Sequence, residues 1–141
     1  MSKRVIEMFL FDIYIEIQKI KHIAKAFDNV QSLLHDFRSW DSIIREFEII
    51  GEASNHLLKN NLLDQRYRQV VNFRNKIIHE YFGIEPDEIW HIITKDLDDF
   101  EKTILKLIES MDNELKEELR ESFITDNHYL DFVVKKLEAI H

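Results

Sequence analysis

The stretch PDEIWHIITKDLDDFEKTILKLIESM, residues 86–111, decides the fold class of this 141-residue chain. Its apolar residues recur at steps of three or four: Ile89, Ile93, Leu97, Phe100, Ile104, Leu107 and Met111. This period puts them on one side of an α-helix of about six turns. Pro86 suits the first turn of a helix, and acidic residues such as Asp87 and Glu88 are favoured near its N-terminus. We therefore predict a helix over residues 86–111 with one buried face.

Residues 5–27 show the same period and predict a first helix. Their apolar stripe consists of Val5, Phe9, Ile13, Ile17, Ile20, Ala24 and Phe27. Met8, Phe11 and Ile15 widen that stripe, so we expect this helix to be covered on two sides.

Two more helices are predicted between these two segments. Residues 40–59 follow a polar stretch, 28–39, and carry the stripe Ile43, Phe47, Ile50, Ser54 and Leu57. Ser39 or Asp41 is the expected N-cap of this helix. Its small residues Gly51, Ala53 and Ser54 would let another helix approach closely. Residues 64–82 predict the next helix, with Gly83 as the left-handed residue that ends it.

The remaining residues, 112–141, predict a helical C-terminal extension. Leu115 and Leu119 mark a short charged helix, and residues 129–140 mark an amphipathic one. The chain has only 2 Gly and 1 Pro, too few for the many turns of a β-rich fold. The predicted fold is therefore all-α: an up-down four-helix bundle over residues 1–111, with an extension over residues 112–141.

Composition excludes several classes of function. The chain has no cysteine, which removes disulfides, zinc–thiolate sites and cysteine nucleophiles. Charged residues interrupt every apolar run, so neither a membrane span nor a signal peptide is expected, and a cytoplasmic setting follows. The net charge is −8, yet residues 59–82 carry five basic and two acidic residues, a net +3 against −11 elsewhere. One basic island thus stands in an acidic chain.

Seven histidines raise the question of a metal site. Glu88 and His91 have the Glu-x-x-His spacing of ferritin-type ligands, but such a site needs a second pair of this kind and two more carboxylates. The other Glu-x-x-His pair, Glu138 and His141, lies in the predicted extension outside the bundle, and Glu52 with His56, one helical turn apart, is a common coincidence. We expect no metal and no other cofactor.

The basic island contains the candidate active site, the segment Arg74-Asn75-Lys76-Ile77-Ile78-His79-Glu80-Tyr81. Residues on a helix advance by roughly 100° each, so Arg74 and Tyr81 share a face whereas His79 lies roughly 140° from Arg74. The two side chains could converge near the helix end. A second copy across a two-fold axis could also bring them together.

These residue types suit metal-free cleavage of RNA. Arginine offers planar paired donors for a phosphate, and histidine exchanges protons near neutral pH. A base would deprotonate the ribose 2′-hydroxyl, whose oxygen attacks the adjacent phosphate while arginine stabilises the developing charge. The bland alternative is a solvated helix end, with Lys76 and Glu80 as a surface ion pair.

Three blocks of the sequence resemble the HEPN superfamily, and more closely its HepT-like (DUF86-type) toxins. The pattern Arg74-x4-His79-x-Tyr81, with a polar residue after the arginine, is similar to the family signature. Residues 45–53 and 73–84 look like its second-helix and third-helix blocks, and residues 89–97 like the start of its fourth helix. The resemblance covers residues 5–110. Glu46 and Glu80 depart from it, since Asn and Gly are common at these positions.

The resemblance implies the toxin of a type VII-like toxin–antitoxin system, a metal-independent endoribonuclease that acts as a homodimer. Arg74 and His79 would be catalytic, with Asn75 and Lys76 in support. The implied antitoxin is a minimal nucleotidyltransferase that silences the toxin by transferring AMP to Tyr81. Two alternatives stay open: a non-catalytic helical module that binds a nucleotidyltransferase, and a purely structural bundle.

Overall fold

The computed structural model describes residues 2–80 and 83–141, apart from the side chains of Lys3 and Arg4. Its four long segments are α1 (Lys3–Ala24), α3 (Phe37–Lys59), α4 (Arg68–His79) and the continuous run of α5 (Pro86–His91), η3 (Ile92–Asp96) and α6 (Leu97–Glu109). Short helices α2 (Val30–Leu34) and η1 (Gln65–Tyr67) connect them, and α7 (Asn113–Asp126) and α8 (Asp131–Glu138) follow. None of the described residues forms a strand, so the all-α prediction is confirmed.

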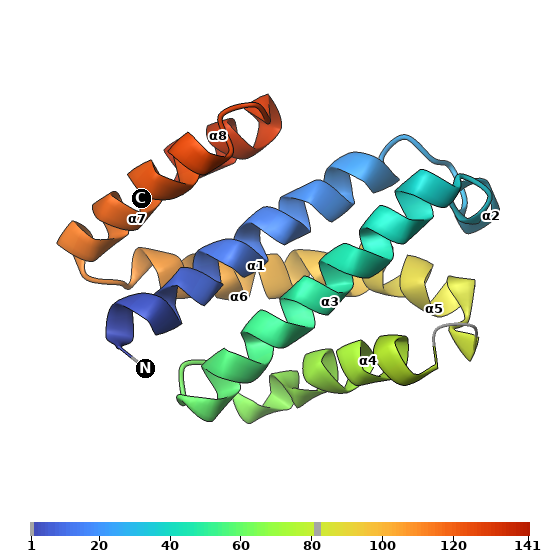
Figure 1. The fold of residues 1–141 in the computed structure, drawn as a ribbon, viewed down its shortest axis with the longest axis horizontal. Coiled ribbons are helices and arrows are strands. Elements are labelled where there is room, and N and C mark those ends of the chain that lie inside the picture. The colour runs from blue at the N-terminus through green and yellow to red at the C-terminus, as the bar shows by residue number, and fades with distance from the viewer. Residues whose placement is uncertain (1, 81–82) are drawn as a thin grey trace.

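The long helices pack as an up-down bundle (Figure 1). Helix α1 packs against α3 and α6, and α3 packs against α4. The predicted stripe of α3 is fully buried, and so are six of the seven apolar positions of residues 86–111, Leu107 being partly buried. Val5 was expected in the stripe of α1 but is 41% exposed, because it lies in the first turn.

Helices α7 and α8 lie along α1 on the side that α3 leaves uncovered (Figure 1). The ring of Phe11 stacks on that of Phe123 with centroids 5.3 Å apart, and His22 stacks on Phe132 at 3.9 Å. The buried Lys116 donates hydrogen bonds to the carbonyl oxygens of Glu109 and His141, both at 3.0 Å. The second apolar face of α1 is therefore used, as predicted. The division of the chain at residue 111 stays a prediction.

The start of α3 differs from the sequence prediction. The helix begins at Phe37, and its N-cap is Asp36, whose carboxylate accepts a hydrogen bond from the Ser39 amide at 3.2 Å. Ser39 and Asp41 were therefore wrong as caps. The apolar stripe does not extend into the first turn of this helix, where Phe37 is 69% exposed. The five-residue α2 was also missed, since it is too short to show a helical period.

The end of α4 also differs. The helix ends at His79, with Glu80 as its C-cap, and not at Phe82. Gly83 has no positive φ, so it is not the predicted left-handed terminator. Phe82 itself lies outside the described residues. Regular α-helical structure thus stops directly after the histidine of the candidate site.

Helices α3 and α4 are in close contact at Gly51. A Cβ atom added at this glycine would lie 2.1 Å from the Cβ of Arg74 and 2.5 Å from its Cγ. The expectation that a small residue admits a neighbouring helix is therefore confirmed at Gly51. Among the described residues, no helix has the length and apolar character that a membrane span requires.

We predict that Gly51→Ala destabilises the protein and displaces Arg74. Alanine is favoured in a helix interior by about 1 kcal/mol, but overpacking of this severity costs about 1–3 kcal/mol or more. Urea unfolding should show a lower free energy of unfolding, with Ser42→Ala, an exposed position on α3, unchanged within about 0.5 kcal/mol. An unchanged or higher stability of Gly51→Ala would contradict the close approach.

Candidate active site

Arg74 lies in the middle of α4 and faces α3. Its Nη2 atom is 2.8 Å from Oε2 of Glu52, and its Nη1 atom donates a hydrogen bond to Oδ1 of Asn75 at 3.0 Å. The side chain stays 30% exposed. Asn75 is therefore in direct contact with one end of the guanidinium, and its supporting role stays a prediction.

A groove of about 430 Å³ opens beside this guanidinium. It is lined by Phe9 and Asp12 of α1, by residues of α3 between Arg45 and Ala53, and by Arg74 of α4. Asp12 is partly buried, and its pKa is raised to about 6, first by burial and then by the charge of Glu16. The groove thus contains two arginines, three acidic side chains and the ring of Phe9, and the pKa of one of the acidic groups, Asp12, is raised.

His79 is the last residue of α4, and its side chain is exposed. Within the described parts of the chain it has no hydrogen bond and no ion pair. It lies five positions after Arg74 on a regular helix, so the two side chains leave the axis roughly 140° apart. Convergence at the helix end, one of the two possibilities considered, is not found among the described residues. Arg74 is held against α3, and His79 stands free at the end of α4.

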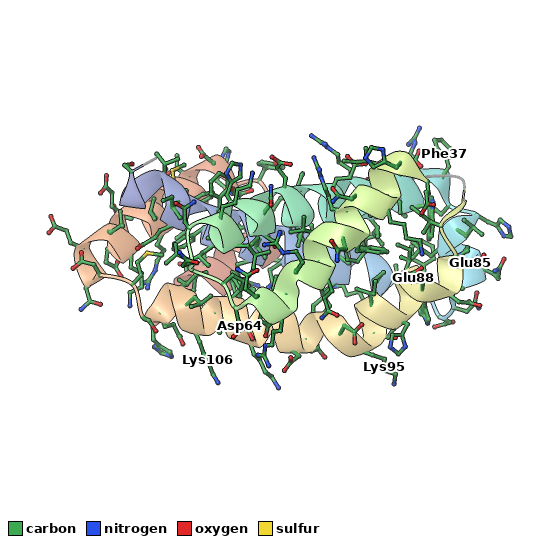
Figure 2. The ribbon with its side chains drawn as sticks, turned by 90° about the horizontal axis from the view of Figure 1, so that it is seen from below. Phe37, Asp64, Glu85, Glu88, Lys95 and Lys106 are labelled. Carbon is green, nitrogen blue, oxygen red and sulfur yellow. The ribbon has the colours of Figure 1, made fainter. Side chains whose placement is uncertain are left out.

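Lys76, the other predicted supporting residue, is tied to the next helix. Its Nζ atom donates a hydrogen bond to Oε2 of Glu88 at 2.9 Å, and Glu88 lies beside the C-terminal end of α4 (Figure 2). This hydrogen bond, together with the negative charge of Glu88, raises the pKa of Lys76 above its usual value. The sequence alternative paired Lys76 with Glu80, whereas the structure pairs Lys76 with Glu88 and so connects α4 to α5.

The expected modification site, Tyr81, lies outside the described residues. The Glu-x-x-His pair is split between two partners: Glu88 binds Lys76, and Nε2 of His91 is 3.9 Å from Oδ1 of Asp96. The described residues contain no group of three or more metal-ligating side chains.

Sequence reasoning missed Glu52 as a site residue. It was noted only as one member of a Glu–His pair, whereas the structure places it against Arg74. A usable signal was present, because Glu52 follows Gly51, the glycine that brings the two helices together.

Sequence reasoning also missed a pair of buried carboxyl groups between α1 and α3. Glu46 is 6% exposed and Glu16 is 9% exposed, and Oε2 of each lacks a hydrogen-bond partner. Burial first, and then the charge of Glu16, raises the pKa of Glu46 to about 8, although Lys19 opposes this shift. Ile43 precedes Glu46 by three residues and Ile50 follows it by four. Glu46 therefore lies on the buried stripe of α3.

We predict that this pair makes stability depend on pH. Between the ordinary pKa of 4.5 and the raised value of about 8, the folded state keeps a proton on Glu46 that the unfolded state has lost. The free energy of unfolding should therefore fall as pH rises through this window. Glu46→Gln should reduce that fall, as measured by urea unfolding at about pH 5 and about pH 8.

Glu48→Gln is the matched control, because Glu48 is on the same helix but pairs with Arg45 at 3.4 Å near the surface. It should keep the wild-type dependence on pH. A Glu46→Gln variant with the same dependence as the wild type would show that Glu46 is ionised in the folded protein.

Comparisons with known proteins show which family this chain resembles. The family described as ribonuclease HepT-like matches residues 13–107, from within α1 to near the end of α6. One Methanocaldococcus jannaschii protein, named as a candidate RNase, is 31% identical over 109 residues, which are 74% of this chain and 97% of that protein. A second, with the same kind of name, is 30% identical over 81% of this chain and 96% of its own length.

A Thermococcus cleftensis protein, named as a candidate ribonuclease HepT, is 30% identical over 67% of this chain and 88% of its own length. No solved structure matches the chain significantly. The family match includes α3 and α4, with Glu52, Arg74 and His79, and it ends before α7. The chain therefore belongs to the HepT-like ribonuclease family.

Proposed function

We propose that this chain is a metal-independent endoribonuclease, the toxin of a type VII-like toxin–antitoxin system acting in the cytoplasm. The observation that carries the proposal is the guanidinium of Arg74, held at the edge of a groove five positions before an exposed histidine. Family membership supports RNA as the substrate, as do the names of the relatives.

The proposed reaction uses two side chains. His79 accepts the proton of a ribose 2′-hydroxyl, and the 2′-oxygen forms a bond to the adjacent phosphorus atom. The bond from phosphorus to the 5′-oxygen breaks, and that oxygen takes up a proton. Arg74 stabilises the negative charge on the phosphate oxygens during this exchange. The products are a 2′,3′-cyclic phosphate and a 5′-hydroxyl, and DNA does not react because it lacks the nucleophile.

A homodimer would bring together an arginine and a histidine that lie apart within one chain. Arg74 and His79 diverge on one helix, and a two-fold axis beside α4 would place the arginine of one copy near the histidine of the other. The local charge of residues 59–82 also supports this arrangement, since two copies would give a groove of about +6 that attracts an RNA backbone.

We predict that Arg74→Ala and His79→Ala each lower RNA cleavage by about 10²–10⁴-fold without unfolding the protein. Cleavage should persist in EDTA and leave cyclic phosphate ends. His35→Ala and Arg38→Ala, exposed residues at the junction of α2 and α3, are matched controls that should cleave normally. Loss of wild-type cleavage in EDTA, with recovery in magnesium, would refute the mechanism. A chain that cleaves no RNA but co-purifies with a nucleotidyltransferase would favour the binding-module alternative.

Regulation by a minimal nucleotidyltransferase antitoxin is the second part of the proposal. The hydroxyl oxygen of Tyr81 would attack the α-phosphorus of ATP, pyrophosphate would leave, and the hydroxyl proton would pass to a base of the partner. Tyr81 lies two positions after His79 and seven after Arg74. An attached AMP would bring a competing anion to Arg74 and obstruct RNA.

We predict that Tyr81→Phe stays active on RNA but cannot be silenced by the antitoxin and ATP. Intact mass should rise by AMP units for the wild type and for Tyr129→Phe, a control that removes the hydroxyl of another tyrosine, a residue that is 69% exposed. The mass of Tyr81→Phe should not change. A rise by whole AMP units in Tyr81→Phe would show that another residue accepts the nucleotide.

A further inference from the structure

The guanidinium of Arg74 is held by acceptors on two of its three nitrogen atoms. Nη2 forms an ion pair with Glu52 at 2.8 Å and Nη1 donates a hydrogen bond to Asn75 at 3.0 Å, whereas Nε is buried and has no hydrogen-bond partner among the described residues. Asn75 takes one of the five N–H donors of the arginine, so each η nitrogen keeps at least one hydrogen that is not committed to a hydrogen bond. Two adjacent donors of this kind match the paired oxygens of a phosphate.

Glu52 reaches Arg74 because α3 and α4 are in contact at this point. Gly51, the preceding residue, leaves no room for a Cβ against the side chain of Arg74. The stem of the arginine is therefore packed on α3, while its head meets the carboxylate of Glu52. Both ends of the side chain are fixed by two consecutive residues of one helix.

The second oxygen of Glu52 lies near a histidine of the same helix. Its Oε1 atom lies 3.6 Å from Nε2 of His56, one turn further along α3, and the His56 ring stacks flat on Phe9 with centroids 4.4 Å apart. A chain of contacts thus runs from α1 through His56 and Glu52 to Arg74. Of the pair Glu52 and His56, Glu52 contacts the arginine.

Stability does not account for this ion pair. Glu52 is 52% exposed and Arg74 is 30% exposed, and ion pairs in such solvent-exposed places contribute little to folding. A carboxylate beside the proposed phosphate-binding arginine also repels the substrate, so it needs a compensating role. Fixing the direction of the guanidinium is such a role, because catalysis depends steeply on how reacting groups are oriented.

We propose that Glu52 is a positioning residue of the ribonuclease site: it holds Arg74 so that the two uncommitted η hydrogens face the scissile phosphate. This inference rests on the proposed function. Glu52 itself touches no reacting atom, and it acts through the orientation of Arg74. The positive charge of the arginine, which attracts RNA, does not depend on Glu52.

The test compares Glu52→Ala and Glu52→Gln with the wild type in steady-state RNA cleavage. Glu52→Ala should lower kcat about 10–100-fold and leave KM unchanged or lower, because orientation is lost whereas charge is kept. Glutamine keeps a carbonyl oxygen that can accept from Nη2, so Glu52→Gln should restore most of kcat. Asp131→Ala, which removes a carboxylate from an exposed ion pair with Lys135 on α8, outside the groove, should cleave normally.

Three results would overturn the inference: wild-type or faster cleavage by Glu52→Ala, equal losses in the alanine and glutamine variants, or a loss that only follows a lower thermal stability. If the wild type cleaves no RNA, the proposed function fails, and nitrogen NMR of Arg74 still decides the inference. Separate Nη signals are expected for the wild type and Glu52→Gln, and averaged signals for Glu52→Ala. Averaged signals in all three would contradict the positioning role.

Discussion

The contact between α3 and α4 at Gly51 is the constraint on which the candidate site depends. A glycine there lets the two helix backbones come together, so the stem of Arg74 packs directly on α3. The same approach brings the short side chain of Glu52 within 2.8 Å of the guanidinium. A larger residue at position 51 would separate the helices, and both the orientation of the arginine and the shape of the groove would change with it.

The sequence predicted most of the fold because helical periodicity reports directly which faces are buried. The stripes of α3 and of residues 86–111 were found in this way, as was the double cover of α1. Helix ends were predicted less well. The start of α3 was placed too late because the apolar stripe does not extend to Phe37, which is exposed. The end of α4 was placed too late because Gly83 was expected to adopt a positive φ.

Pairwise contacts within the site could not be predicted from spacing alone. Arg74 and Asn75 were identified by residue type, but the partner of Arg74 comes from α3, 22 positions earlier, and only packing brings Glu52 to it. The pairing of Lys76 with Glu88 depends likewise on where α5 begins. The sequence places Glu46 on an apolar stripe, but periodicity does not tell how far burial shifts the pKa of its carboxyl group.

The division of labour between Arg74 and His79 is the central claim of this account, and mixing two inactive chains tests it most directly. Chains with Arg74→Ala and chains with His79→Ala are unfolded together, refolded together and assayed on RNA. If a site takes its arginine from one copy and its histidine from the other, mixed dimers contain one intact site, and the mixture should regain about a quarter of wild-type activity. If mixed dimers form, as native mass spectrometry would show, and the mixture is as inactive as each variant alone, the shared site is contradicted.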